Sequence, residues 1–140
     1  MFECIKRLFR KKVDRSDYRP QLNYDGWQHN EVVVVALINR YRLDKGLNRF
    51  QPELLLHDLA TNRARKLTEQ SHNGVGTYFS DMTYNNFTRL REILGFGYTK
   101  PESVVEAWKL SEGHNRALLA DVRYIGVGQY NNKWVAFICD

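Results

Sequence analysis

Two histidines, 42 residues apart, are the residues of this sequence best suited to chemistry. His72 follows a helical stretch and opens a loop rich in Gly, Asn and Ser, whereas His114 follows Gly113 at the point where a helix is expected to end. Imidazole nitrogen is a common ligand of Zn²⁺, so two rings that leave two helix ends could converge on one divalent metal ion. Spacing alone does not bring them together, and the alternative is two unrelated surface residues.

Four glutamates are the acidic candidates, and Glu92 is the least ordinary of them. It lies in the apolar context LREILGFG, so its carboxylate is either turned to solvent or directed into a pocket. Glu102 is expected to complete a capping box with Thr99 at a helix start, and Glu106 is expected to be solvated. The fourth, Glu112, stands two residues before His114.

The other titratable and aromatic residues are expected to be structural. His29 and His57 lie within helical stretches, with His57 partly exposed, and Cys139 alternates with Ile138 as a small buried strand residue. No Ser-His-Asp order, phosphate-binding loop, CxxC pair or HExxH motif occurs. The aromatic set is expected in the core: Trp108, Tyr124, Trp134 and Phe137.

The elements that must position these residues are mainly helical. A first helix from about His29 to Lys45 is predicted to end at Gly46, and a second to carry Pro52 in its first turn and end near Gln70. The apolar face predicted for the first helix comprises Val32, Val35, Ala36, Asn39 and Leu43.

The second half of the chain mixes helices and strands. Residues 71–86 are predicted to form a loop, with its Gly-rich part at residues 73–81, and a short helix is predicted from about Asn86 to Leu94. A fourth helix follows Thr99, and two β-type runs around Asn131-Asn132 predict a hairpin, because Asn tolerates left-handed turns.

Length and composition indicate one globular domain. The chain has 140 residues, and its hydrophobic share of 43% and charged share of 26% are ordinary. No run of eighteen apolar residues or secretory signal is recognisable, and the two cysteines stand at opposite ends. We therefore expect a reducing compartment and a protein that is cytoplasmic or assembled into a particle.

The positive charge belongs to residues 1–26, which read as an N-terminal arm before a domain of residues 27–140. Residues 1–20 hold seven Lys or Arg against three Asp or Glu, whereas residues 21–140 hold fourteen against thirteen. The nearly neutral body does not favour nucleic-acid binding. The arm is either a frayed terminus or a segment that docks on a protein partner, a larger assembly or a lipid surface, through Lys6, Arg7, Arg10, Lys11 and Lys12.

Several stretches in a fixed order carry a family resemblance. They are ALINRYRLDKGLNRF, LATNRARKLTEQSH, EILGFGYTKPESVVEAWKLSEGH, and IGVG followed by a Trp-containing strand. From about Glu31 to the C-terminus the chain resembles the CAP superfamily (cysteine-rich secretory protein, antigen 5 and pathogenesis-related-1), and most closely its short bacterial or phage-type members. The resemblance implies an α+β fold, a three-layer α-β-α sandwich, here with a basic N-terminal arm.

The resemblance also implies a site. In that family the two histidines face each other across a cleft lined by acidic residues, which carries over to His72, Glu92 and His114. The family's further Glu, three residues after the Trp, falls here on Ser111, with Glu112 one position later.

Two departures from the family pattern bear on activity. The family's Gly-Glu-Asn is here Arg91-Glu92-Ile93, and the usual secretion signal and disulfides are missing. These differences weaken a transfer of activity more than a transfer of fold.

Three functions follow as expectations. The first is a non-enzymatic ligand- or protein-binding module whose His/Glu cleft holds Zn²⁺ or another divalent metal at His72 and His114. The second is a structural or assembly component, for example of a phage particle, docked through the basic arm. The third is a metal-assisted hydrolase in which Glu92 acts as general base.

Overall fold

The fold is taken from a computed structural model that describes residues 22–140, so the arm's five docking residues lie outside the described part. The boundary between an arm and a domain at residue 26 stays a prediction. Within residues 22–140 no helix has both the length and the apolar character needed to cross a membrane. The elements in chain order are α2 (His29–Asp44), β1 (Gln51–Pro52), α3 (Leu54–Lys66), α4 (Gly76–Tyr84), β2 (Arg91–Phe96), α5 (Pro101–Leu110), α6 (Glu112–Leu118), β3 (Tyr124–Tyr130) and β4 (Lys133–Cys139).

A four-stranded sheet in the order β1-β3-β4-β2 forms the centre of the described fold. β4 pairs antiparallel with both β3 and β2, and the short β1 pairs parallel with β3. A two-residue turn joins β3 to β4, with φ of 47° at Asn131 and 60° at Asn132. Both values are left-handed, as a type I′ hairpin requires, so the predicted hairpin is confirmed.

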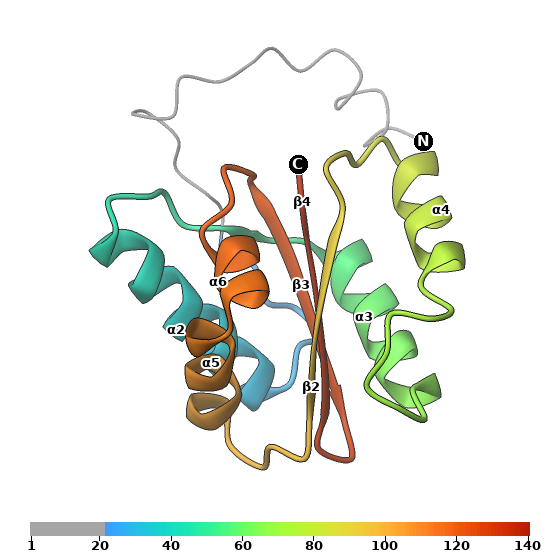
Figure 1. Ribbon diagram of the computed structural model, residues 1–140. Coiled ribbons are helices and arrows are strands. Elements are labelled where there is room, and N and C mark those ends of the chain that lie inside the picture. Colours follow the sequence, from blue (N-terminus) through green and yellow to red (C-terminus); the bar gives the residue numbers. More distant parts are fainter. Residues whose placement is uncertain (1–21) are drawn as a thin grey trace.

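Helices cover both faces of this sheet (Figure 1). Alternate residues of β4 point to opposite faces, so Trp134 packs in a cluster with helices α2, α5 and α6, whereas Val135 packs in a cluster with α3 and α4. The predicted three-layer α-β-α arrangement and α+β class are therefore confirmed. All four aromatic residues expected in the core, and Cys139, are buried.

The helix layer containing α3 lies unusually close to the sheet at two glycines of β3. A Cβ atom at Gly126 would overlap with the backbone of Leu56 and His57, and one at Gly128 would overlap with the backbone of Ala60 and Thr61. The GVG sequence thus lets a helix backbone lie directly on a strand, one of the uses of glycine within sheets.

α2 occupies the predicted range, but its buried face is rotated from the predicted one. Val35 and Asn39 of the predicted face are buried, whereas Leu43 is exposed. The other buried residues are Glu31, Val34, Ile38 and Arg42, two of which are charged. The prediction avoided charged positions, whereas the buried stripe continues at helical spacing through Glu31 at one end and Arg42 at the other.

Strand β2 corrects the predicted helix from Asn86 to Leu94. Residues Arg91–Phe96 pair in register with β4, from Arg91 opposite Ile138 to Phe96 opposite Lys133. Both faces of this strand are covered, so its sequence lacks the alternation of a half-exposed strand. The region predicted as a loop, residues 71–86, contains the whole of helix α4, which buries Tyr78 and Met82 one turn apart.

Three helix boundaries were also predicted wrongly. Pro52 lies in β1 opposite Ile125 and not in the first turn of a helix, and α3 ends at Lys66 instead of near Gln70. At α5 the N-cap residue is Lys100, without a side-chain capping bond, and Pro101 is the first helical residue. The predicted Thr99–Glu102 capping box is therefore one residue out of register with the helix.

The prediction that His57 is partly exposed was wrong as well. Its side chain is 7% exposed, its Nδ1 donates to the carbonyl of Val127 at 2.8 Å, and Trp27 stacks on its ring. Glu31 lies 3.8 Å away and accepts hydrogen bonds from the backbone N–H groups of Gln28 and Gln129. Burial raises the pKa of Glu31, although these N–H groups and His57 oppose the rise.

Candidate functional site

A cleft of about 670 Å³ lies between the two helix layers, along the edge of the sheet formed by β2. One wall comes from the start of α6 and the residues after it, and the other from the His72 segment and α4. The floor is formed by residues 90–93. The lining residues that carry the argument below are His72, Glu92, Ser111, His114, Arg91 and Arg116.

Glu92 is directed inward from the floor, which decides between the two alternatives left by the sequence. Its side chain is 1% exposed, and its carboxylate forms a two-point ion pair with Arg63 of α3. Arg63 Nε lies 2.8 Å from Oε2, and Nη2 lies 3.2 Å from Oε1. A planar guanidinium matches a carboxylate in this way, so the buried charge of Glu92 is compensated.

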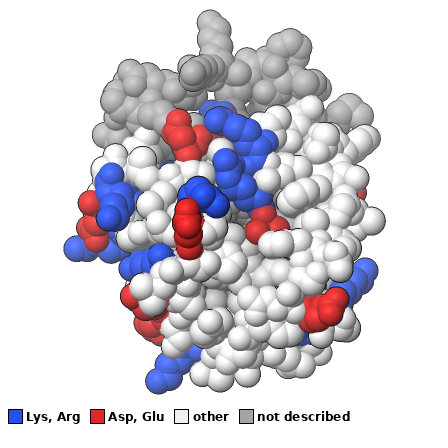
Figure 2. All heavy atoms as spheres, viewed as in Figure 1, with Lys and Arg blue, Asp and Glu red and all other residues white. Residues whose placement is uncertain are grey.

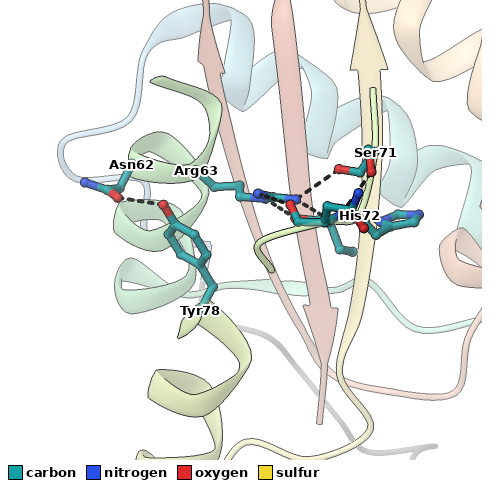
Figure 3. Close-up of polar contacts among 7 residues, drawn as sticks. Asn62, Arg63, Ser71, His72 and Tyr78 are labelled. Carbon is teal, nitrogen blue, oxygen red and sulfur yellow. Dashed lines mark hydrogen bonds and ion pairs between the residues drawn. The ribbon is translucent and has the colours of Figure 1, made fainter. Parts of the chain in front are cut away.

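Arg63 also holds the chain segment that carries His72. Its Nη2 donates to the carbonyl of Ser71 at 3.1 Å, and its Nη1 donates to the carbonyl of Asn73 at 3.0 Å. Figure 3 shows this side chain reaching from α3 to the backbone around His72. A single buried arginine therefore fixes the acidic residue and the histidine segment together.

His72 is oriented by Glu92. Its Nδ1 lies 2.8 Å from Glu92 Oε1, while the ring is 62% exposed. A carboxylate only accepts hydrogen bonds, so Nδ1 carries a proton, and in the neutral ring the lone pair lies on Nε2. Carboxylates commonly set the tautomer of metal-binding histidines by the same contact.

His114 reaches the same cleft from the opposite wall. It lies in the first turn of α6, which starts directly after Ser111, so the expected placement on a helix exit is replaced by a helix start. Burial lowers the pKa of His114, and the nearby charge of His72 lowers it further. Both histidines thus face one cleft, and burial there favours the neutral form of His114.

The two remaining predicted cleft residues differ in position. Ser111 joins α5 to α6 and lines the cleft. Glu112 does not line it: its side chain is 89% exposed and lies 3.4 Å from Arg116. The two residues lie one turn apart along α6 and are exposed to solvent, so their ion pair contributes little to stability.

The residues of this cleft offer few ligands for a metal ion. Among residues 22–140 no group of three or more His, Cys, Asp and Glu is placed to hold one. Both oxygens of Glu92 already accept hydrogen bonds from Arg63 and His72, which leaves the imidazoles of His72 and His114 as the free donors on this cleft. Two imidazoles fall short of the three protein ligands of a catalytic zinc site.

Sequence reasoning missed the arginines of the site. Arg63 is buried on α3 and its partner Glu92 lies 29 positions further along the chain, so helical spacing gave no signal. Arg91 and Arg116 line the cleft, as do the apolar residues Val75 and Phe79. Arg91 could have been found from the sequence, because it stands next to Glu92, which was already a candidate residue of the site.

Comparison with known proteins places this geometry in a family. The model of the CAP family, described as the cysteine-rich secretory protein family, matches residues 35–140. No curated protein sequence matches the chain significantly.

Solved structures share the fold. An extracellular protein with an SCP domain from Bacillus anthracis str. Ames is 20% identical with a TM-score of 0.69, over 79% of this chain and 40% of its own. A cysteine-rich secretory protein from Staphylococcus aureus subsp. aureus Mu50 is 14% identical with a TM-score of 0.70, over 89% and 42%. An outer surface protein from Borrelia burgdorferi is 24% identical with a TM-score of 0.70, over 81% and 93%.

The first two of these proteins are much longer than the matched region, so the chain spans less than half of their length. Two of the three are described as extracellular or outer surface proteins, which gives no support to the cytoplasmic location expected from the sequence. The family match covers most of the chain and agrees with the sandwich described above. The chain belongs to the CAP family.

Proposed function

We propose that this CAP domain is a non-enzymatic binding module whose ligand occupies the cleft between His72 and His114. The observation that carries the proposal is the cleft itself: about 670 Å³, largely apolar, with a few polar groups held in place by buried contacts. Ligand pockets typically combine this size with an apolar lining and few oriented polar groups.

The hydrolase alternative requires a free general base. Glu92 is the candidate, but its oxygens already accept hydrogen bonds from Arg63 and His72. A base must lie within hydrogen-bond reach of the proton that it takes and have a lone pair available for it. No observation on the described residues favours this alternative over binding, and we derive no hydrolytic step.

A divalent metal ion at this site would be held by two imidazoles, from His72 and His114. Its remaining coordination positions would be left to water or to the ligand, so we expect weaker binding than in a structural zinc site with four protein ligands. Metal would then assist ligand binding without being needed for the fold.

The test is a calorimetric titration of Zn²⁺ into the full chain. We expect about one equivalent to bind to the wild type, and binding to disappear in His72→Ala/His114→Ala. His29→Ala is the matched control, because His29 is an exposed histidine outside the cleft. Zinc binding that is equal in all three proteins would remove the cleft as a metal site.

Activity is checked on the same proteins. We expect no hydrolysis of a labelled casein substrate by the zinc-loaded wild type. Hydrolysis that is present in the wild type and lost in His72→Ala/His114→Ala would overturn the non-enzymatic part of the proposal and support the hydrolase alternative.

The basic arm carries a second candidate function, docking onto a protein assembly. Its motivation is the concentration of the excess positive charge in residues 1–20. Deletion of these residues is expected to abolish localisation or assembly while zinc binding persists. If the truncated chain localises and assembles as the full chain does, the docking function is refuted.

A further inference from the structure

Strand β2 has an edge that no other strand covers among the described residues. β4 pairs with one side of β2, and the other side lies along the cleft. Figure 1 shows α6 and α4 on either side of this strand. Edge strands present backbone N–H and C=O groups that can pair with another chain, and natural proteins usually cover them. On β2 some of these backbone groups have hydrogen-bond partners within residues 22–140 and others do not.

The register of the sheet identifies the groups that face the cleft. The two-residue turn makes Tyr130 and Lys133 a hydrogen-bonded pair, so Trp134, Ala136 and Ile138 direct their backbone groups to β2. The N–H of Gly97 donates to the carbonyl of Asn132 at 2.9 Å, in the same register.

It follows that Arg91, Ile93 and Gly95 use their backbone groups to pair with β4. The backbone groups of Glu92 and Leu94 point away from β4, toward the open edge.

The backbone groups of Leu94 and Glu92 differ in how far they are covered. The carbonyl of Leu94 accepts a hydrogen bond from the buried indole N–H of Trp108 at 2.9 Å, so this part of the edge is covered. At Glu92 the side chain is 1% exposed whereas the whole residue is 8% exposed, so the exposed surface lies mainly on its backbone. The fold thus covers one end of the edge and leaves the backbone of Glu92 open on the cleft floor.

We propose that an extended peptide binds in the cleft as an added strand, pairing its backbone with the N–H and C=O of Glu92. This inference rests on the proposed binding function and names the class of ligand. In β-strand addition the backbone pairing supplies affinity, while pockets for alternate side chains supply specificity. Both requirements are met here, because the walls on the two sides of β2 differ in chemistry.

The wall on the α4 side is apolar apart from the ring of His72. Its apolar part is formed by Val75, Phe79 and Leu90, and the carboxylate of Glu92 on this side is paired with Arg63. The side chains of a peptide strand that point this way should therefore be apolar.

The wall on the α6 side carries two cations, Arg91 and Arg116, beside His114, Ala117 and Ala120. Figure 2 shows Lys and Arg side chains grouped near the upper middle of this face, next to acidic ones. Because successive side chains of a strand alternate, the structure favours a peptide in which apolar and acidic residues alternate. The side chain of Glu112 contacts Arg116 from outside the cleft, so it weakens this preference without reversing it.

The experiment uses ¹⁵N-labelled full-length protein and the peptide Ac-Val-Glu-Val-Glu-Val-Glu. In the free protein we expect the amide of Glu92 to exchange with solvent much faster than that of Ile93, which pairs with β4. At saturating peptide, exchange at Glu92 should slow by about tenfold or more, because the amide gains a partner.

Three controls test the mode of binding. A peptide N-methylated at alternate residues, which cannot form the backbone ladder, should not protect Glu92. Replacing the Glu residues of the unmodified peptide by Lys should weaken binding. The variant Arg91→Ala/Arg116→Ala should lower affinity for the acidic peptide by about threefold or more, whereas Arg40→Ala, outside the cleft, should not.

The outcomes separate this inference from the function on which it rests. Zinc binding that depends on the histidines, without protection of the Glu92 amide at millimolar peptide, overturns strand addition and leaves the binding module standing. Absence of both removes the cleft as a binding site. Peptide binding with unchanged exchange at Glu92, or equal binding of the N-methylated peptide, also overturns the inference.

Discussion

Replacing Arg63 by Met should destabilise this domain more than replacing any neighbouring surface arginine. The guanidinium makes two hydrogen bonds to Glu92, at 2.8 and 3.2 Å, and one each to the carbonyls of Ser71 and Asn73. Methionine fills similar space but leaves a buried carboxylate with His72 as its remaining side-chain partner.

The magnitude follows from burial. The side chains of Arg63 and Glu92 are 6% and 1% exposed, and removal of one partner from a buried pair costs about 3–5 kcal/mol. The two backbone carbonyls are only partly buried and can bond to water, so each adds at most about 1 kcal/mol. The total is a large share of the roughly 5–15 kcal/mol that stabilises a domain.

The measurement is urea unfolding of the wild type, Arg63→Met, Glu92→Leu and the double variant. The double variant removes both charges, so we expect it to cost no more than about half as much as Arg63→Met alone. Arg65→Met is the matched control on the same helix, exposed and expected to change stability by less than about 0.5 kcal/mol. A cost below about 1 kcal/mol for Arg63→Met, or additive costs in the double variant, would refute the reasoning.

Three further predictions concern packing, titration and the hairpin. Gly128→Ala should cost about 1–3 kcal/mol or more in urea unfolding because helix backbone lies against the glycine, whereas Gly76→Ala, with open space around it, should be neutral or stabilising. In an NMR titration the pKa of His114 should lie below 6.5, and His72→Gln should raise it only part of the way, because burial is the larger cause. Because the pKa of His114 is lower in the folded chain, the unfolded chain binds more protons, and the free energy of unfolding should fall as pH decreases from about 6.5 through the folded pKa. If the free energy of unfolding depends on pH in the same way in the wild type and in His114→Gln, this prediction is contradicted. Asn132→Val, at φ of 60°, should cost about 1–2 kcal/mol by thermal unfolding, and a neutral result would count against the type I′ turn.

The elements with strong local signals could be predicted from the sequence. The first helix ends where Gly46 adopts a φ of +77°, and the hairpin turns at two asparagines in the left-handed region. In both cases the backbone conformation is one that few residue types adopt, so the residue type at the position is enough to predict it. The resemblance then placed both histidines on one cleft, which spacing could not do.

Strand β2 could not be predicted in this way because its burial depends on layers formed by distant segments. Ile93 packs toward α2, α5 and α6, and Leu94 packs toward α3 and α4. A strand covered on both faces has no alternation of polar and apolar residues, so a short apolar run with one Glu is compatible with either a helix or a strand.

Buried charges limited the prediction for a related reason. Glu31, Arg42 and Arg63 occupy inward positions of their helices, and partners as far away as Gln129 satisfy them. Charged residues are rarely buried unless they are paired, so a sequence without known contacts places them on the surface. The predicted face of the first helix was rotated for this reason.

The same buried arginines explain how the cleft is kept ready for a ligand. Arg63, from the layer of α3, holds the backbone on both sides of His72. Arg42, from α2 in the other layer, donates to the carbonyls of Leu118 and Ala120 at 2.9 Å, and Ala120 lines the cleft. Each wall is therefore tied to its own helix layer by a guanidinium that bonds to irregular backbone.

Such ties reduce the conformational entropy that a ligand must otherwise remove on binding. An edge strand held between two fixed walls can accept a peptide without rearrangement, whereas mobile walls would first have to be ordered. Weakening either tie should therefore reduce affinity for the peptide even where no peptide contact is lost. This links the stability of the two helix layers to binding at the edge of β2.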